Sequence, residues 1–307
     1  MQYDSGMRAA LIISCAWALA ATAVAQDSSS EKVPEATFRT GTDLVSLNVS
    51  AFDDRGQLLK GLPKSAFTVL ENGVQQEISV FLQEDVPVSV GLIIDTSGSM
   101  ENKWRRVVSS ALAMIQASNP DDEVFTIYFN ETAEMGQEFT SDVGMLERNL
   151  HSIRPRGGTA MRDAMMLGID HLRARASHDK RVLVVITDGE DNSSFVSQYR
   201  LAEAARRSNV IVYAIGLLAD DIMRSAAEAR RSLEELTLAT GGRSWFPRDV
   251  GEIAAITPEI AHEIRNQYIV AYKPADPTKD GKWRAITVEV DVPGATVRTR
   301  SGYYAKP

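Results

Sequence analysis

Three oxygen-bearing side chains follow an apolar stretch at alternate positions. Residues 90–94 are apolar without a break, and Asp95, Ser97 and Ser99 come directly after them. An unbroken apolar run of this length is typical of a buried central strand, which delivers the next residues to the edge of a sheet. Carboxylate and hydroxyl oxygens are hard ligands, and Gly98 lets the backbone turn tightly. A short turn could therefore aim all three side chains at one cation of the magnesium class.

The pattern Asp-x-Ser-x-Ser after an apolar strand resembles the metal-ion-dependent adhesion site (MIDAS) of von Willebrand factor type A domains. That site also contains a threonine in a glycine loop, matched here after Gly157 and Gly158, and an aspartate after a later strand, matched here after residues 182–187. Five residues match in chain order: Asp95, Ser97, Ser99, Thr159 and Asp188.

The resemblance implies a role for each of these residues. The hydroxyl groups of Ser97 and Ser99 bind the cation directly, Thr159 does so when a ligand is bound, and the two aspartates act through waters. Few anionic groups in direct contact leave the ion electrophilic, so that it attracts a carboxylate from a partner protein. We therefore expect Mg²⁺, with Mn²⁺ as a substitute, and a protein ligand that offers an acidic side chain.

Other interpretations of the same residues stay open at this point. Either aspartate could cap a helix, and so could Ser97 or Ser99. Asp191 we interpret as part of a solvated loop. A hydrolase with Asp95 as nucleophile would need Asp-x-Asp, but the third residue is Ser97, so the general acid is missing. The sequence also lacks Gly-x-Ser-x-Gly and a phosphate-binding Gly-x-x-x-x-Gly-Lys-Ser/Thr loop. We expect a non-enzymatic binding module, and the alternative is a structural envelope protein with a vestigial metal site.

Composition excludes several classes of protein. The chain has 307 residues, of which 44% are hydrophobic and 24% charged, so one or two globular domains with a large core are expected. The formal net charge of −8 argues against a nucleic-acid surface. We expect no nucleic-acid partner, and no stretch after residue 25 is apolar for long enough to span a bilayer.

The N-terminal residues predict export. Arg8 precedes apolar residues 9–25, which end in Ala-Val-Ala, so residues 1–25 read as a cleaved signal peptide and 26–36 as a flexible leader. A minor alternative is a lipoprotein signal that ends at Cys15, the only cysteine. We expect the mature protein in the periplasm or outside the cell.

Strands and helices alternate over residues 88–266, which predicts a Rossmann-like, doubly wound and mostly parallel sheet with helices on both faces. Its ligand crevice is expected at the carboxyl ends of the strands. Within this domain we expect, among others, a helix over 196–208 and one over 250–266.

The flanking segments, 37–87 and 267–307, have strand patterns only. One is a continuous strand expected over 74–82 after a hairpin turn at Asn72-Gly73. Because isolated two- or three-stranded pieces are marginally stable, we expect the two segments to pair into one small β-sandwich. These flanks, with motifs such as Arg300-Ser301-Gly302-Tyr303-Tyr304, resemble the exported von Willebrand factor type A-related proteins of acidobacteria. That resemblance implies no defined ligand.

Overall fold

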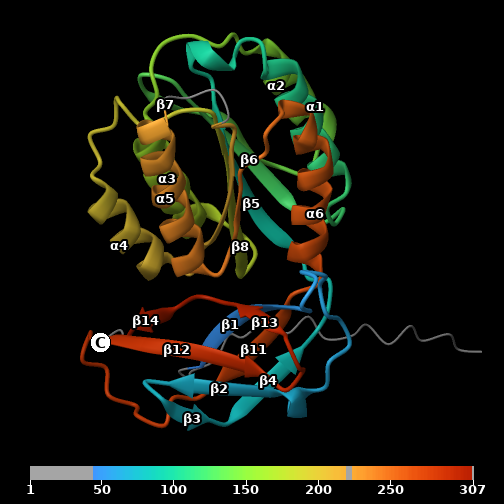
Figure 1. Cartoon of the computed structure of the whole chain (residues 1–307), viewed down its shortest axis with the longest axis vertical. Coiled ribbons are helices and arrows are strands. Elements are labelled where there is room, and N and C mark those ends of the chain that lie inside the picture. Colours follow the sequence, from blue (N-terminus) through green and yellow to red (C-terminus); the bar gives the residue numbers. More distant parts are fainter. Residues whose placement is uncertain (1–43, 219–222, 306–307) are drawn as a thin grey trace, which may run out of the picture. The chain divides into compact units, whose positions relative to one another are not determined.

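The computed structural model describes residues 44–218 and 223–305 (Figure 1). The predicted signal peptide, the leader and Cys15 lie outside the described residues. No helix in the described part of the chain is both long enough and apolar enough to cross a membrane.

Residues 88–245 contain a six-stranded sheet in the order β10-β9-β8-β5-β6-β7. All neighbouring strands pair in parallel except β6 and β7, which are antiparallel. Every residue of β5 is buried, because the strand is central in the sheet and helices cover both of its faces. The strands are β5 (Val88–Asp95), β6 (Glu123–Phe129), β7 (Ala133–Thr140), β8 (Lys180–Thr187), β9 (Ile211–Gly216) and β10 (Ser244–Trp245).

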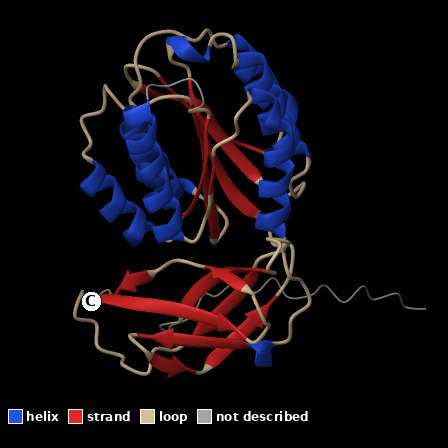
Figure 2. Cartoon of the chain, in the orientation of Figure 1, coloured by secondary structure: helices blue, strands red, loops and turns tan. Residues whose placement is uncertain are grey.

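Helices lie on both faces of this sheet (Figure 2). Successive residues of β5 point to opposite faces, so Leu92 and Ile94 belong to one core cluster and Ile93 to another. The first cluster includes α1 (Trp104–Gln116), α2 (Val143–Ser152) and α6 (Ile253–Arg265). The second includes α3 (Met161–Arg175), α4 (Gln198–Ser208) and α5 (Met223–Thr240). The predicted α/β class, with helices on both faces of a mostly parallel sheet, is confirmed.

Two predicted helix boundaries were wrong. The helix expected from 196 begins at Gln198, because the side chain of Ser197 caps it by accepting a hydrogen bond from the Arg200 amide at 3.3 Å. The helix expected over 250–266 is divided into a short 3₁₀ turn, Val250–Glu252, and α6. At the first of these boundaries the position of the start depends on a side-chain cap, which apolar periodicity does not reveal.

The remaining strands form two four-stranded sheets, in the orders β13-β1-β11-β4 and β14-β12-β2-β3. β1 pairs with β11, and β2 pairs with β12, so strands before and after the α/β part share sheets. The division of the chain into these domains, with the β part folding as one unit, stays a prediction. The strands are β1 (Val45–Phe52), β2 (Phe67–Glu71), β3 (Val74–Gln76), β4 (Ile78–Leu82), β11 (Tyr268–Tyr272), β12 (Trp283–Val290), β13 (Thr296–Arg298) and β14 (Gly302–Tyr304).

The hairpin at Asn72-Gly73 is present, but the long strand after it is broken. Asn72 and Gly73 have φ values of 49° and 81°, the left-handed conformations that a tight two-residue hairpin needs. The chain then leaves one sheet and enters the other: β3 pairs with β2, whereas β4 pairs with β11. The expected strand over 74–82 is therefore two strands in two sheets.

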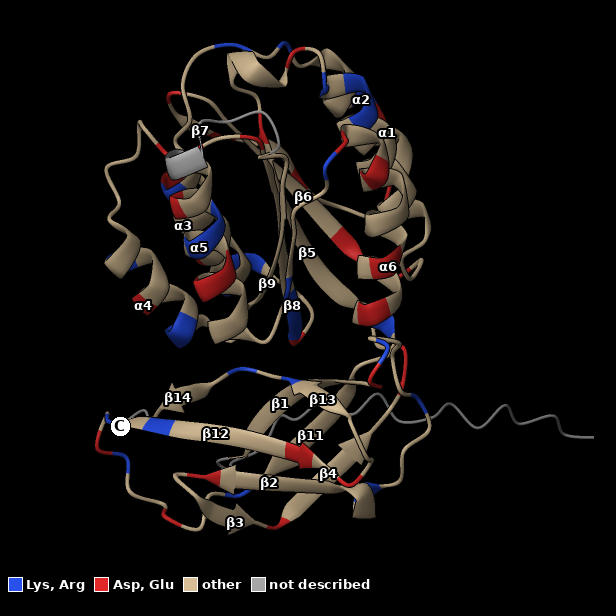
Figure 3. Ribbon diagram, in the orientation of Figure 1, with Lys and Arg blue, Asp and Glu red and all other residues tan. Residues whose placement is uncertain are grey.

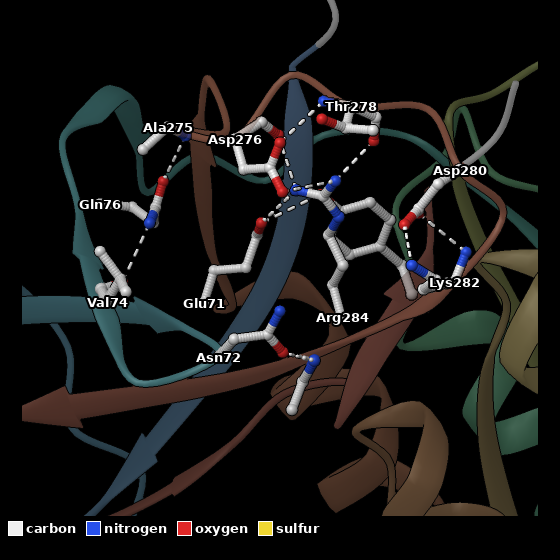
Figure 4. A network of polar contacts seen from close by, with 12 residues as sticks. Glu71, Asn72, Val74, Gln76, Ala275, Asp276, Thr278, Asp280, Lys282 and Arg284 are labelled. Atoms are coloured by element: carbon white, nitrogen blue, oxygen red, sulfur yellow. Dashed lines mark hydrogen bonds and ion pairs between the residues drawn. The ribbon is translucent and has the colours of Figure 1, made fainter.

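A buried ion pair lies inside the β part (Figure 4). Glu71 and Arg284 are each 4% exposed, and Glu71 Oε1 accepts a hydrogen bond from Arg284 Nη1 at 2.9 Å. The other carboxylate oxygen accepts hydrogen bonds from the hydroxyl groups of Tyr272 and Tyr303 at 2.7 and 2.9 Å. The guanidinium also donates to two backbone carbonyl groups, those of Asp276 and Thr278. The pair is thus satisfied on both sides, as a buried charge requires.

Candidate metal centre

The loops that follow β5 and β8 begin side by side at one edge of the sheet. The two strands are parallel neighbours, with Ile94 opposite Ile186. Asp95 ends β5, and Asp188 comes directly after the last residue of β8. Because parallel strands end at the same edge, their register alone brings the two carboxylates together.

Asp95 is completely buried and held by two hydrogen bonds. Its Oδ1 accepts from the Ser97 amide at 2.8 Å, and its Oδ2 accepts from the Thr187 hydroxyl at 2.7 Å. Burial raises the pKa of the Asp95 carboxyl to about 6, and the hydrogen bonds from Ser97 and Thr187 oppose that rise. The two hydrogen bonds thus fix the orientation of this carboxylate at the end of β5.

The two serines and Asp188 form a continuous chain of contacts. Ser97 Oγ and Ser99 Oγ are 3.1 Å apart, and Ser99 Oγ donates to Asp188 Oδ1 at 2.7 Å. The second oxygen of Asp188, Oδ2, accepts from Lys103 Nζ at 2.7 Å. Asp188 therefore has a hydroxyl on one oxygen and an ammonium group on the other.

Thr159 joins the site through a glycine loop. Gly157 has a φ of 81°, and its carbonyl accepts a hydrogen bond from the Gly98 amide at 3.2 Å, which ties this loop to the Ser97–Ser99 turn. The Thr159 amide donates to Asn192 Oδ1 at 3.0 Å, and the Thr159 carbonyl accepts from the Asn192 amide at 3.0 Å. The Thr159 hydroxyl also lies close to Gly189: it is 3.7 Å from the position that a β-carbon would occupy if this residue had one. The loop that carries Thr159 is thus fixed against the loop that follows Asp188.

All five residues nominated from the sequence lie on these three joined loops. Four of them are linked directly: Asp95 to Ser97, Ser97 to Ser99, and Ser99 to Asp188. The described residues contain no cluster of three or more His, Cys, Asp or Glu side chains suited to a metal ion, and two of the five nominated residues are carboxylates. Any ion here would depend on hydroxyl oxygens.

The donor set fits a small hard cation. Two neighbouring oxygens on an octahedral Mg²⁺ ion stand about 2.9 Å apart, and the two serine oxygens are separated by 3.1 Å. Since the Ser99 hydroxyl donates its hydrogen to Asp188, it accepts from Ser97 with one lone pair and can offer the other to a cation. The spacing of the two serine oxygens is therefore compatible with a small divalent cation.

Sequence reasoning missed three residues of the site and misjudged a fourth. Thr187 orients Asp95, Lys103 neutralises Asp188, and Asn192 holds Thr159. A hydroxyl at the very end of the apolar strand β8 was the available signal for Thr187. Asp191 is not solvated, because its side chain is only 3% exposed and lies 3.0 Å from the guanidinium of Arg162.

A mostly parallel sheet with hydroxyl and carboxylate groups at its carboxyl edge belongs to the Rossmann-like α/β class. Residues 90–190 match the family model of the von Willebrand factor type A domain, and the α/β part of the chain has the fold of this family. Domains of this family are generally non-enzymatic modules of protein–protein interaction.

Solved structures share the fold at low sequence identity. A von Willebrand factor type A protein from Catenulispora acidiphila is 15% identical, with a TM-score of 0.50, over 87% of this chain and 75% of that one. Proximal thread matrix protein 1 from the mussel byssus, solved with a zinc-occupied MIDAS motif, is 14% identical with a TM-score of 0.50, over 64% of this chain and 50% of that one. At these identities the likeness shows the fold alone.

A curated relative matches over a shorter stretch. The uncharacterized protein sll0103 of Synechocystis sp. is 28% identical over 111 residues, which are 34% of this chain and 26% of that protein. The match thus spans about a quarter of the relative's length.

Proposed function

We propose that this chain is an exported, non-enzymatic module that captures a protein partner through a divalent cation. The observation that carries the proposal is the contact chain from Ser97 Oγ through Ser99 Oγ to Asp188. In this chain of contacts two hydroxyl oxygens lie 3.1 Å apart, close to the roughly 2.9 Å between neighbouring ligands of magnesium, and a carboxylate that could hold a metal-bound water lies next to them.

Each residue of the centre has its own part in this function. Ser97 and Ser99 would hold the cation directly, Thr159 would join them when a partner is bound, and Asp95 and Asp188 would hold its waters. The bound ion supplies a positive charge that attracts a carboxylate of the partner. Lys103 offsets the charge of Asp188, which leaves the ion more electrophilic toward that carboxylate.

The choice of cation rests on the donor atoms. Hard oxygen ligands favour Mg²⁺, with Mn²⁺ as a substitute. The zinc-occupied MIDAS motif of the mussel protein supports a divalent cation at this position of the fold. For the location of the protein, the N-terminal export pattern of residues 1–25 supports the periplasm or the extracellular space.

A thermal melt of residues 26–307 against Mg²⁺ and Mn²⁺ tests the metal centre. A ligand that binds only the folded state stabilises it by about 2.7 kcal/mol at roughly one hundred times its dissociation constant. We expect a higher melting temperature for the wild type and no shift for Asp95→Ala or for Ser99→Ala, which removes one hydroxyl from an exposed residue. Asp170→Ala is the matched control, since Asp170 lies on α3 with a side chain that is 60% exposed.

The wild type must then bind acidic peptides in Mg²⁺ and release them to a chelator. A shift that persists in Asp95→Ala and Ser99→Ala would refute the site. A wild type with no shift at millimolar metal would favour the structural role.

A further inference from the structure

Phe195 is an aromatic side chain on the surface beside the candidate metal centre. It is 97% exposed and lies in the loop of residues 189–197, here termed the Phe195 loop, between β8 and α4 (Figure 1). Single exposed apolar side chains are common on protein surfaces, so exposure alone says little. Two features distinguish Phe195: its backbone is held by hydrogen bonds to a carboxylate, and its loop is bonded to Thr159.

Asp163 holds the backbone on both sides of the Phe195 side chain. Its Oδ2 accepts a hydrogen bond from the Phe195 amide at 3.1 Å, and its Oδ1 accepts from the Val196 amide at 2.8 Å. Asp163 lies in the first turn of α3, a rigid element packed on the sheet. One carboxylate thus fixes the peptide groups that present the ring.

A second buried carboxylate closes the loop. Asp191 accepts hydrogen bonds from the Ser194 amide at 3.1 Å and from the Ser194 hydroxyl at 2.6 Å. It also accepts from the Arg162 amide at 2.6 Å, and the Arg162 guanidinium donates to the Val196 carbonyl at 2.8 Å. A surface that is ordered before binding loses less conformational entropy when a partner binds. The loop therefore presents Phe195 in a form suited to contact.

The Phe195 loop is also joined to the candidate metal ligand Thr159. Asn192 exchanges two hydrogen bonds with the backbone of Thr159, and the Ser193 amide donates to the same carbonyl at 3.1 Å. Phe195 is three residues beyond Asn192, which is at most about 11 Å of chain. A partner held at the cation could reach the ring with a neighbouring side chain.

Two exposed arginines on the loop beside the site can attract an acidic partner. Arg154 and Arg156 are exposed on the loop that leads to Thr159, and the Arg156 amide donates to the Thr96 carbonyl at 2.7 Å, which keeps this loop against the metal turn. Positive side chains at the rim attract a partner carboxylate and raise its association rate. The whole chain has a net charge of −8, and basic and acidic residues are mixed over the helices (Figure 3), which disfavours an anionic membrane as the occupant.

We propose that Phe195 is the second contact of the partner, and that the partner is a protein segment in which an apolar side chain lies one to three residues from the metal-bound carboxylate. This inference rests on the proposed function. An extended segment advances about 3.3 Å per residue, so three residues of a partner cover about 10 Å, which is comparable with the chain length from Asn192 to Phe195. Rigid aromatic side chains in the centre of an interface commonly contribute most of its affinity.

An array of synthetic peptides tests the proposal. Each peptide has one Glu in a Gly/Ser background and one Leu placed one to six residues away on either side, and matched peptides lack the Leu. In Mg²⁺ we expect the wild type to bind peptides with a spacing of one to three residues about tenfold more tightly than Glu-only peptides, and to bind none in a chelator. Phe195→Ser should lose this advantage and keep its metal-induced melting shift. The matched control is Leu238→Ser, because Leu238 is 69% exposed on α5, and this variant should behave as the wild type.

Several results would overturn the second contact. Equal binding of Leu-containing and Glu-only peptides by the wild type, or an unchanged preference in Phe195→Ser, would do so while the metal-dependent capture itself stands. A wild type that shows the metal shift but binds no peptide would overturn capture and second contact together. Binding to phosphatidylglycerol vesicles in chelator that depends on Phe195 would assign the ring to a membrane instead. Loss of the wild-type metal shift is a separate readout, and it would refute the metal centre.

Discussion

Lys103 Nζ lies 2.7 Å from Asp188 Oδ2, so the carboxylate proposed to hold a metal-bound water is already paired with an ammonium group. The lysine side chain is only 20% exposed and reaches Asp188 from the turn before α1. A nearby positive charge weakens the binding of a cation and strengthens the attraction of the bound cation for an anion. The same contact is therefore expected to tune metal binding and partner binding in opposite directions.

Lys103→Met should tighten metal binding and weaken capture of acidic peptides. Removing one partly screened charge near the ion is worth about 1 kcal/mol, or roughly fivefold in each affinity. Calorimetric titration with Mn²⁺, followed by titration of a Glu-containing peptide, measures both. Lys103→Arg keeps the charge and serves as the control, so its two affinities should stay close to those of the wild type. Weaker metal binding by Lys103→Met would show instead that the lysine organises the site.

Thr187→Val should destabilise the folded protein and weaken metal binding. The substitution keeps the shape but removes the hydroxyl that donates to Asp95 at 2.7 Å, and it leaves a completely buried carboxylate oxygen without this partner. Such a loss costs about 1–3 kcal/mol. Urea denaturation in chelator measures the stability, and the melting shift with Mg²⁺ measures the site. Thr187→Ser retains the hydroxyl and should recover most of both, whereas equal effects of the two variants would assign the loss to packing.

Because the ammonium group of Lys180 is buried, we expect the free energy of unfolding to depend on pH above about pH 8. Burial lowers the pKa of its ammonium group to about 8, although Asp85, Asp122 and Glu263 act in the opposite direction, and the group donates to the Ile264 carbonyl. Between about pH 8 and 10.5 the unfolded chain therefore binds more protons at this residue than the folded one. This lysine then makes the free energy of unfolding rise with pH, by about 3 kcal/mol across the window.

The comparison with Lys180→Met isolates this contribution, because all other groups titrate alike in both proteins. We expect the stability difference, wild type minus variant, to increase from pH 8 to 10.5 and to be constant below pH 7. Urea denaturation at half-unit pH steps provides the measurement. Parallel curves through the whole range would show that the ammonium group keeps an ordinary pKa in the folded state.

Glu71→Gln should strongly destabilise the β part of the chain. The variant leaves the guanidinium of Arg284 buried without its carboxylate, and breaking a buried pair on one side costs about 3–5 kcal/mol. Lys282→Ala is a suitable control from the same region (Figure 4): the Lys282 side chain is 82% exposed, and its ion pair with Asp280 is of the surface kind, worth about 0–1 kcal/mol. Circular dichroism during thermal unfolding compares the two, and equal melting temperatures would contradict the role assigned to Glu71.

The class of fold and the place of the candidate site could be predicted from the sequence because both depend on local patterns. An apolar run that ends in Asp95 marks a central parallel strand, and the second such run ends at Asp188. Neighbouring parallel strands end at one edge of a sheet. Once β5 and β8 are known to be parallel neighbours, the two aspartates are expected to lie close together. The resemblance of the five-residue pattern to a known metal site added Thr159.

Contacts between distant parts of the chain were decided only by the tertiary structure. Thr187 is 92 residues from Asp95, Lys103 is 85 residues from Asp188, and the Phe195 amide meets an Asp163 oxygen across 32 residues. The passage of the chain from β3 to β4 between two sheets is of the same kind. Hydrogen bonds and ion pairs of this sort depend on strand register and helix placement to within about an ångström, and local residue preferences hold no information about such distances.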